Sequence, residues 1–372
     1  MRRQRQRQPL GRGLRRAHDV PALTAPARLS PLPAQPAATP WPTRDWPLAA
    51  IPPSADREVI AAALDHAFAP AAAPDLGETH ALLVVSGGRL VVERYASGFG
   101  PDIACPSWSI AKSITHALVG LLAGEKRLDV AAPAEVPQWR SAGDPRGAIT
   151  LDHLLRMSSG LAFIEEYVTG EPSDVIEMLF GAGKDDVAAF AAAFPLAHPP
   201  GTFFAYSSGT TNIVSRCAAT ALGADGPAFE AFMRRRLFDP LGMRSPKPRF
   251  DAAGTFIGSS FCFATPRDFA RFGLLYLRGG LWEGERLLPE GWVDYARTPT
   301  FQQPGGEADG RYGAHWWLDL AGPGSFSANG YDGQYIALVP EKDLIVVRHG
   351  ATPMALKDNL KRWLKDLAAA FA

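Results

Sequence analysis

The residues most able to do chemistry are a serine and a lysine three positions apart, Ser109 and Lys112, in the stretch CPSWSIAKSITHALVGLL. Apolar residues recur around them at helical spacing, which predicts a helix from about Ser109 to Gly124. Residues three apart are neighbours on a helix, so the hydroxyl and the amine can meet. The dipole at this end of a helix repels a cation. Burial and the same positive end would lower the lysine pKa, so that the amine can take the proton of a nucleophilic serine.

Two later segments carry groups that could act on the same substrate. In GTFFAYSSGTTNIV, Tyr206 precedes a predicted helix, and a tyrosine beside a lysine can serve as a general acid or base. In ANGYDGQYIALV, Gly333 opens a predicted strand and leaves the Gln334 N–H free for close approach to an oxyanion, as the Ser109 N–H is at its helix end. All three segments also have a plainer structural interpretation. Ser109 and Lys112 could be a helix cap and a solvated lysine, Tyr206 a packed aromatic, and Gly333 part of a turn before a strand.

Together, these segments resemble the serine β-lactamase and penicillin-binding-protein superfamily, in the branch with class C β-lactamases, family VIII-type esterases and 6-aminohexanoate-dimer hydrolases. That family has, in order, S-x-x-K, then Y-x-N or Y-S-S, then a K-T-G-like strand motif. The matching residues here are Ser109 to Lys112, Tyr206 to Ser208, and Tyr331 to Gly333. The resemblance covers about Ala81 to Val347 and leaves out the first fifty residues.

The resemblance implies roles for individual residues. Ser109 would be the acylated nucleophile, Lys112 its activating partner and Tyr206 the general acid or base. The N–H groups of Ser109 and Gln334 would form the oxyanion hole. Tyr167, in LAFIEEY, resembles a substrate-contacting tyrosine of the nylon-oligomer group. The implied reaction uses no metal and no organic cofactor.

Departures from the family pattern bear on the substrate. Ser208 stands where β-lactamases usually have asparagine, and Tyr331 stands where K-T-G has its lysine. The cation that grips the carboxylate of a β-lactam is therefore missing from the motif, and efficient β-lactamase activity is not expected. Esters, or amides of short non-peptide chains, are the better prediction. A substrate amine could then meet an acidic side chain, for which the candidates are Glu165, Glu166 and Asp332.

The elements that would position these groups are predicted from periodicity. A helix capped by Ser54 with an apolar stripe (Val59, Ile60, Ala63, Leu64 and Ala67) precedes two β-branched runs that flank Gly87-Gly88, a hairpin signal. Near the other end, two strands flank Pro340–Asp343, and a last helix carries one apolar face (Leu356, Leu360, Trp363, Leu364, Leu367 and Phe371). Thr265-Pro266 opens a further helix. We expect both ends of the chain to share one sheet.

The predicted fold is α/β (α+β): a β-lactamase-like antiparallel sheet flanked by helices, with an inserted helical subdomain and the active site between them. The predicted boundaries are a disordered basic and proline-rich tail over 1–50, a discontinuous sheet domain over 51–113 and 256–372, and a helical subdomain over 114–255. Ordered structure is expected to begin near Ser54. Ten prolines from Pro21 to Pro53 indicate an extended linker or strap.

Composition excludes several other classes. The chain has 372 residues, 47% hydrophobic and 20% charged, which is typical of a globular protein. Its three cysteines suit neither a disulfide framework nor a zinc ribbon. Formal net charge is zero, although seven arginines lie in residues 1–16, and this basic tail is assigned no nucleic-acid role. With no apolar run of membrane-spanning length and no secretion signal, we expect a cytoplasmic protein without nucleic-acid or membrane partners. The oligomeric state is left open.

Two alternatives to a serine esterase or amidase remain. A Ser-His-Asp hydrolase would need a G-x-S-x-G elbow and a metallohydrolase an H-E-x-x-H helix, and the sequence contains neither. A non-catalytic binding protein that keeps the fold is the rival from another class. The other is a weak β-lactamase or D,D-peptidase. In every case the partner is a small molecule.

Overall fold

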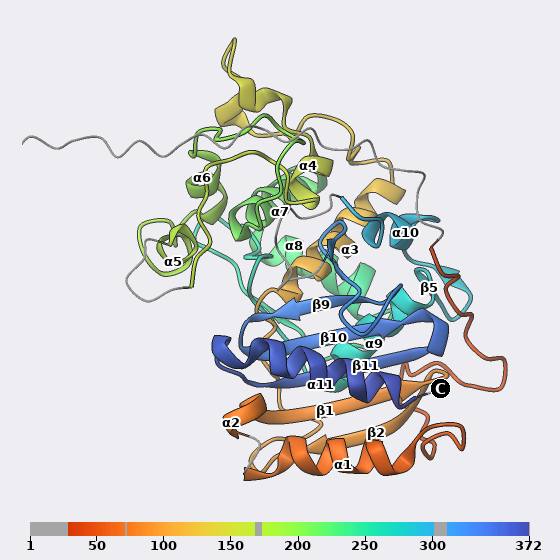
Figure 1. The fold of residues 1–372 in the computed structure, drawn as a ribbon. Coiled ribbons are helices and arrows are strands. Elements are labelled where there is room, and N and C mark those ends of the chain that lie inside the picture. The colour runs from red at the N-terminus through yellow and green to blue at the C-terminus, as the bar shows by residue number, and fades with distance from the viewer. Residues whose placement is uncertain (1–28, 71–72, 168–172, 301–310, 372) are drawn as a thin grey trace, which may run out of the picture.

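The computed structural model describes residues 29–70, 73–167, 173–300 and 311–371, and its centre is one sheet (Figure 1). The sheet has seven strands in the order β2-β1-β11-β10-β9-β8-β7, each antiparallel to its neighbours. The strands are β1 (Glu78–Ser86), β2 (Arg89–Tyr95), β7 (Arg311–Tyr312), β8 (Trp317–Leu318), β9 (Phe326–Gly330), β10 (Gln334–Val339) and β11 (Leu344–Ala351). The predicted antiparallel sheet is therefore confirmed.

Two tight hairpins bring the ends of the chain together. Gly87 and Gly88, with φ of +57° and +73°, join β1 to β2, a backbone that glycine adopts without strain. The turn at 340–343 joins β10 to β11. β1 then pairs with β11 along its length, from Glu78 opposite Ala351 to Ser86 opposite Leu344. The prediction that both ends share one sheet is confirmed.

Helices α1 (Arg57–Phe68), α2 (Ala73–Leu76) and α11 (Lys357–Ala369) cover one face of the sheet (Figure 1). Leu360, Leu364 and Leu367 of α11 are buried against the sheet, as their spacing predicts. The start of α1 differs from the prediction. Asp56, not Ser54, is its N-cap and accepts from the Val59 N–H, because Ser54 lies in the turn that the Ala55 N–H closes onto Pro52. Val59 is 45% exposed and does not join the apolar stripe.

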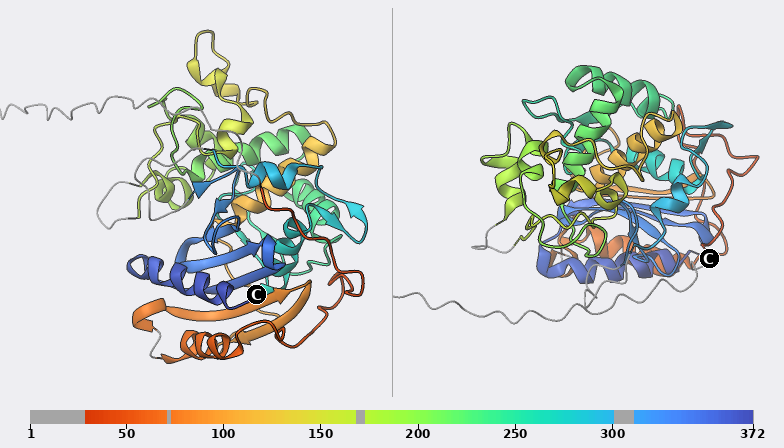
Figure 2. Two further views of the ribbon diagram at one scale, coloured as in Figure 1. Left: turned by 45° about the vertical axis from the view of Figure 1, so that its right-hand side comes forward. Right: turned by 90° about the horizontal axis from the view of Figure 1, so that it is seen from above.

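The other face carries α9 (Pro266–Leu277) and α3 (Ile110–Gly124), and most of the other helices lie beyond α3 (Figure 2). Thr265 caps α9 by accepting from the Asp268 N–H, as predicted. The helical part contains α4 (Leu151–Leu155), α5 (Asp174–Phe180), α6 (Val187–Ala192), α7 (Ser208–Leu222) and α8 (Gly226–Met233), and α10 (Trp292–Ala296) lies nearer the sheet. Two-residue strands form two small hairpins, β3 (Lys247–Pro248) with β4 (Cys262–Phe263) and β5 (Leu281–Trp282) with β6 (Glu285–Arg286).

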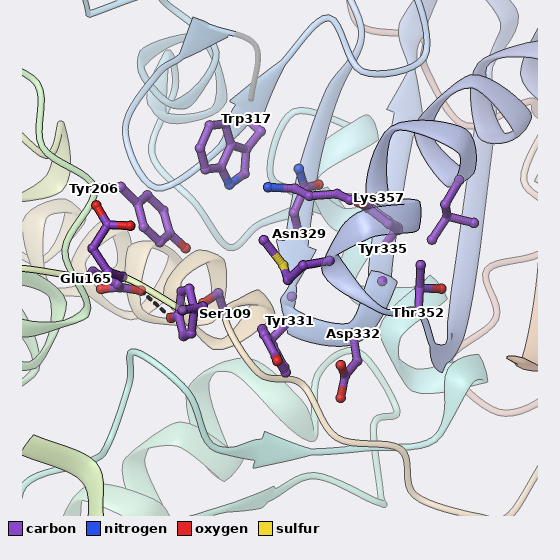
Figure 3. Close-up of a pocket in the computed structure, with 16 residues that line it drawn as sticks. Ser109, Glu165, Tyr206, Trp317, Asn329, Tyr331, Asp332, Tyr335, Thr352 and Lys357 are labelled. Carbon is purple, nitrogen blue, oxygen red and sulfur yellow. Dashed lines mark hydrogen bonds between the residues drawn. The ribbon is translucent and has the colours of Figure 1, made fainter. Parts of the chain in front are cut away.

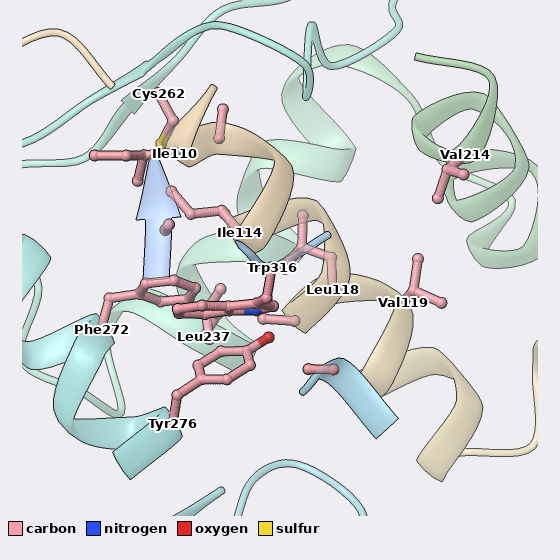
Figure 4. Close-up of a cluster of buried hydrophobic side chains, with 14 of the residues drawn as sticks. Ile110, Ile114, Leu118, Val119, Val214, Leu237, Cys262, Phe272, Tyr276 and Trp316 are labelled. Carbon is pink, nitrogen blue, oxygen red and sulfur yellow. The ribbon is translucent and has the colours of Figure 1, made fainter. Parts of the chain in front are cut away.

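One hydrophobic cluster joins the helical part to this face of the sheet (Figure 4). It contains Val119 of α3, Val214 of α7 and Phe272 of α9, and at its centre the Trp316 ring lies 4.4 Å from the Tyr276 ring. The boundary predicted between residues 113 and 114 falls inside α3, which has buried side chains on both sides of that point. Helix α3 thus belongs to both regions and sets its first turn between them.

The tail predicted to be disordered over 1–50 is wrong for residues 29–50, and residues 1–28 lie outside the described part. Trp46 is 6% exposed, and its indole N–H donates to the Arg267 carbonyl. Leu90 donates to the Pro47 carbonyl, which adds this segment to the edge of β2. Arg271 donates to the Pro42 carbonyl. Proline prevents a helix here, but an extended chain offers its carbonyls to donors of the folded body. Residues 29–50 are therefore a strap packed on the body.

Candidate active site

Ser109 is the N-cap of α3, and the side chain of Lys112 folds back to it. Trp108, just before the serine, has a φ of +43°, a backbone conformation that bulky residues rarely adopt. Lys112 is only 1% exposed, and its Nζ lies 2.9 Å from the hydroxyl oxygen of Ser109. It also donates to Ser208 Oγ and to the Ser259 carbonyl, both at 2.9 Å. The predicted contact between the hydroxyl and the amine is confirmed, and the amine has a hydrogen-bond partner in each of its three bonding directions.

The buried position of Lys112 changes its acidity. Desolvation penalises the ammonium form and lowers the pKa of Lys112 to about 8, while the charge of Glu165 opposes part of that decrease. A substantial fraction of the amine is therefore neutral near pH 8. A neutral amine 2.9 Å from a serine hydroxyl is placed to accept its proton.

Tyr206 lies in the loop that leads into α7. The Lys112 nitrogen lies 4.8 Å from the centre of the Tyr206 ring. The ring packs against Trp317, with 5.2 Å between centroids, and against Tyr312. Figure 3 shows the Tyr206 hydroxyl pointing into the pocket on the side of Ser109. The structure thus brings the serine and lysine at the start of α3 together with a tyrosine from the loop before α7.

The third motif forms a strained turn between β9 and β10. Asp332 and Gly333 have φ of +59° and +79°. The buried guanidinium of Arg348, on β11, donates to the carbonyls of Gly333 at 2.9 Å and of Asp332 at 3.3 Å. A Cβ on Gly330 would lie 2.4 Å from the Ser107 carbonyl, so glycine lets the end of β9 approach the nucleophile segment. These contacts hold the turn beside Ser109.

Gln334 begins β10 with its side chain buried away from the pocket. The amide nitrogen of that side chain donates to the Gly350 carbonyl at 2.7 Å, and its oxygen lies 3.0 Å from Nδ1 of His349. Burial lowers the pKa of His349 to about 3, so this histidine is neutral at ordinary pH. That the backbone N–H groups of Gln334 and Ser109 form an oxyanion hole stays a prediction.

A cavity of about 330 Å³ opens over Ser109 (Figure 3). Five of the residues predicted for catalysis or substrate binding line it: Ser109, Tyr167, Tyr206, Tyr331 and Gly333. The three acidic candidates for a substrate amine, Glu165, Glu166 and Asp332, line it as well. Lys112, Ser208 and Gln334 are buried and are not among the lining residues. The other lining residues are Trp317, Asn329, Gly330, Tyr335, Thr352, Met354, Lys357 and Leu360.

Lys357 is a lining residue that the sequence analysis missed. It is the first residue of α11 and extends toward Trp317 (Figure 3). A cationic side chain thus lines the cavity from an element other than the third motif, and no local motif marks it. Among the described residues, no three histidine, cysteine or acidic side chains gather in a way that could hold a metal ion. The same residues include no helix with the length and apolar character needed to cross a membrane.

Glu165 is engaged within the protein, whereas the sequence analysis treated it as a possible contact for a substrate amine. Its carboxylate accepts from the Ser208 backbone N–H, from the Ser208 hydroxyl at 3.0 Å and from the Tyr167 hydroxyl at 2.7 Å. Burial raises the pKa of Tyr167, so its phenol stays protonated and donates. The Tyr167 ring also lies 5.3 Å from the Tyr331 ring. Glu165 thus links the wall of the cavity to the contacts of Lys112.

The chain is similar to known proteins over most of its length. Residues 68–370 match the family model described as Beta-lactamase. A 6-aminohexanoate-dimer hydrolase of Paenarthrobacter ureafaciens is 25% identical over 303 residues, which is 74% of this chain and 73% of that protein.

Two solved structures share the fold. A candidate 6-aminohexanoate-dimer hydrolase from Bacillus anthracis has a TM-score of 0.70 and 21% identity, over 91% of this chain and 90% of that one. A penicillin-binding-protein homologue from Caulobacter crescentus has a TM-score of 0.66 and 17% identity, over 87% and 99%. At this identity, the two structures establish the fold alone.

Proposed function

Because the chain belongs to the beta-lactamase family, we propose that it is a serine hydrolase that cleaves an ester or amide through an acyl-enzyme on Ser109. The observation that carries this proposal is the 2.9 Å contact between the Lys112 nitrogen and the Ser109 hydroxyl, made by a lysine that is 1% exposed. A structural lysine would keep its ammonium in water. A buried amine against a serine hydroxyl is the arrangement that nucleophilic catalysis needs.

The reaction has two halves. Neutral Lys112 takes the hydroxyl proton while Ser109 Oγ forms a bond to the substrate carbonyl carbon, and the carbonyl π electrons move onto its oxygen. When that oxyanion collapses, the bond to the leaving alcohol or amine breaks, and the leaving group receives a proton from Tyr206 or Lys112. Water then attacks the acyl carbon and gives one proton to the same groups. When the second oxyanion collapses, the bond between the acyl carbon and Ser109 Oγ breaks, that oxygen takes the proton back, and the acid leaves. The N–H groups of Ser109 and Gln334 would stabilise both oxyanions.

The substrate that fits best is a short-chain ester or a 6-aminohexanoate-type oligomer. Tyr331 occupies the motif position of a carboxylate-gripping lysine, and aromatic and aliphatic side chains form much of the cavity wall. The relative from Paenarthrobacter ureafaciens, named for the 6-aminohexanoate dimer, supports the same class. Lys357 favours a second candidate, weak β-lactamase or D,D-peptidase activity, because it brings a cation to the cavity from α11.

A substrate panel with a covalent probe tests the proposal. p-Nitrophenyl esters, linear 6-aminohexanoate dimer and nitrocefin are compared with Ser109→Ala as the blank. A fluorophosphonate should add its phosphonyl mass to the wild type and to Ser113→Ala, a serine on the same helix bonded to the His315 carbonyl, but not to Ser109→Ala. Absence of both turnover and adduct, in a protein shown to be folded, would favour the non-catalytic binding protein.

A further inference from the structure

Glu165 reaches Lys112 through one intervening hydroxyl. The Lys112 amine donates to Ser208 Oγ at 2.9 Å, and the Ser208 hydroxyl lies 3.0 Å from Glu165 Oε1. The other carboxylate oxygen accepts from the Ser208 backbone N–H, at the first residue of α7. A carboxylate can only accept, so the single proton of the Ser208 hydroxyl is directed at Glu165. The lone pairs of that hydroxyl are then left for Lys112.

This arrangement fixes the orientation of the neutral amine. A neutral lysine has two N–H donors and one lone pair. The Ser259 carbonyl can only accept, and Ser208 Oγ can only accept from this side because its proton is engaged with Glu165. Both N–H groups of Lys112 are therefore committed, and the lone pair is left for the third neighbour, Ser109 Oγ. That is the direction in which a base must face the nucleophile.

Among the described groups around Lys112, Glu165 is the one whose charge acts on the ammonium. The Tyr206 ring presents its face 4.8 Å away, and His315, packed against the first turn of α3, contacts the Lys112 carbonyl. Burial and the lysine charge lower the pKa of His315 to about 3, so it is neutral at ordinary pH. Glu165 is the described group whose charge opposes the desolvation of the Lys112 ammonium.

We propose that Glu165 is a positioning residue of this site, which through the Ser208 hydroxyl turns the Lys112 amine toward Ser109 Oγ and directly anchors the Tyr167 phenol at the cavity wall. The inference rests on the proposed function, in which Lys112 is the base for Ser109. Glu165 bonds Ser208 and Tyr167, and it touches neither Ser109 nor a reacting atom. It acts through Ser208 and through its charge.

The variant Glu165→Gln tests the inference, because it keeps the side-chain size while it removes the charge and places an amide where two acceptor oxygens are needed. The pKa of Lys112 is measured directly from the pH titration of its Nζ resonance in protein labelled with ¹⁵N-lysine, assigned by Lys112→Arg. Loss of the negative charge should shift this titration to lower pH. The control Glu177→Gln, an exposed glutamate on α5, should leave it unchanged.

Turnover of p-nitrophenyl acetate is the second readout. In Glu165→Gln we expect kcat to fall by about tenfold to a hundredfold with a smaller change in KM, because a misdirected base slows the chemical step. If Glu165→Gln does not fold, Ser208→Ala breaks the same link and should lower kcat by a similar factor.

The outcomes separate this inference from the proposed function. An unchanged Lys112 titration in Glu165→Gln, or an equal shift in Glu177→Gln, overturns the role of Glu165 whatever the enzyme hydrolyses. A specific shift supports that role even in a protein that turns over none of the panel, which would count against the proposed function alone. Wild-type kcat in a folded Ser208→Ala would also overturn the inference.

Discussion

The Lys112 nitrogen lies 2.9 Å from the Ser109 hydroxyl oxygen, within one turn of α3, at a depth where the lysine is 1% exposed. A lysine at this end of a helix gains nothing from the dipole, and one removed from water loses hydration. Three hydrogen-bond acceptors and the negative charge of Glu165 offset part of the free energy lost when the ammonium leaves water. The lowered pKa of Lys112 sets the pH range in which the amine can act as a base.

Hydrolysis of a neutral ester should depend on pH through Lys112. The active form is the neutral amine, and its fraction rises as pH passes upward through a pKa of about 8. We therefore expect kcat/KM for p-nitrophenyl acetate to increase with pH below about 8 and to level off above it. Initial rates across this range, corrected for spontaneous hydrolysis, measure this rising limb of the pH profile. In Lys112→Ala the limb should be lost and the rate should fall by about a hundredfold or more; a flat wild-type profile would contradict the role of Lys112.

The effect of Tyr206→Phe should depend on the leaving group. A p-nitrophenolate leaves without a proton, whereas an amine must be protonated, so loss of the Tyr206 hydroxyl should slow amide cleavage more than ester cleavage. We expect kcat to fall by about a hundredfold for linear 6-aminohexanoate dimer and by less for p-nitrophenyl acetate. Tyr312→Phe is the matched control, because Tyr312 packs on Tyr206 but does not line the cavity. Equal losses for the two substrates would argue against a general-acid role.

Arg348→Met should loosen the turn at 331–333, because it removes the donors that hold the carbonyls of this turn. The buried guanidinium bonds the carbonyls of Gly333, Asp332 and Glu78, and methionine fills part of the volume while it satisfies none of them. We expect the free energy of unfolding to fall by about 3 kcal/mol, since buried carbonyls lose their donors. Denaturant melts measure this loss. Because the turn positions the predicted Gln334 donor, kcat should fall more than KM rises. Unchanged kcat in the folded variant would show that the turn needs no such support.

Tyr331→Lys should restore the cation that the third motif lacks. Tyr331 lines the cavity over Ser109, so a lysine there can meet a substrate carboxylate. We expect KM for nitrocefin to fall by about tenfold, which corresponds to roughly 1.4 kcal/mol of binding. A neutral p-nitrophenyl ester should show no such gain and serves as the internal control. If KM for nitrocefin does not change, Lys357 becomes the group to test for carboxylate binding, by Lys357→Gln.

Trp46→Ala should destabilise the protein without changing its chemistry. Trp46 anchors the strap, at 6% exposure and with a hydrogen bond to the Arg267 carbonyl, far along the chain from the cavity residues. Truncating a buried tryptophan costs about 3 kcal/mol or more. Leu48→Ala is the matched control, because the Leu48 side chain is 69% exposed in the same strap. Thermal melts should therefore shift for Trp46→Ala alone, with kcat of the folded enzyme close to wild type; equal melting temperatures would show that the strap contributes nothing.

Much of the framework was predictable because it depends on local rules. The Gly87-Gly88 hairpin, the Thr265-Pro266 start of α9 and the apolar face of α11 all follow from backbone preference and side-chain period within a few residues. The pairing of Ser109 with Lys112 is local in the same sense, since helix geometry alone places residues three apart side by side.

Only the tertiary structure decided how deep Lys112 lies and which groups surround it. Its neighbours Ser208, Ser259 and Tyr206 come from segments that no local pattern ties to α3, as do Glu165 behind Ser208, Arg348 behind the turn and Lys357 at the cavity. For the proline-rich segment, the sequence predicted an extended linker or strap, but not that residues 29–50 are packed on the body, because composition shows that no helix forms and not that Trp46 has a pocket to fill. Helix and hairpin rules act over a few residues, whereas burial, and with it the pKa of a lysine, depends on packing between segments far apart in the chain.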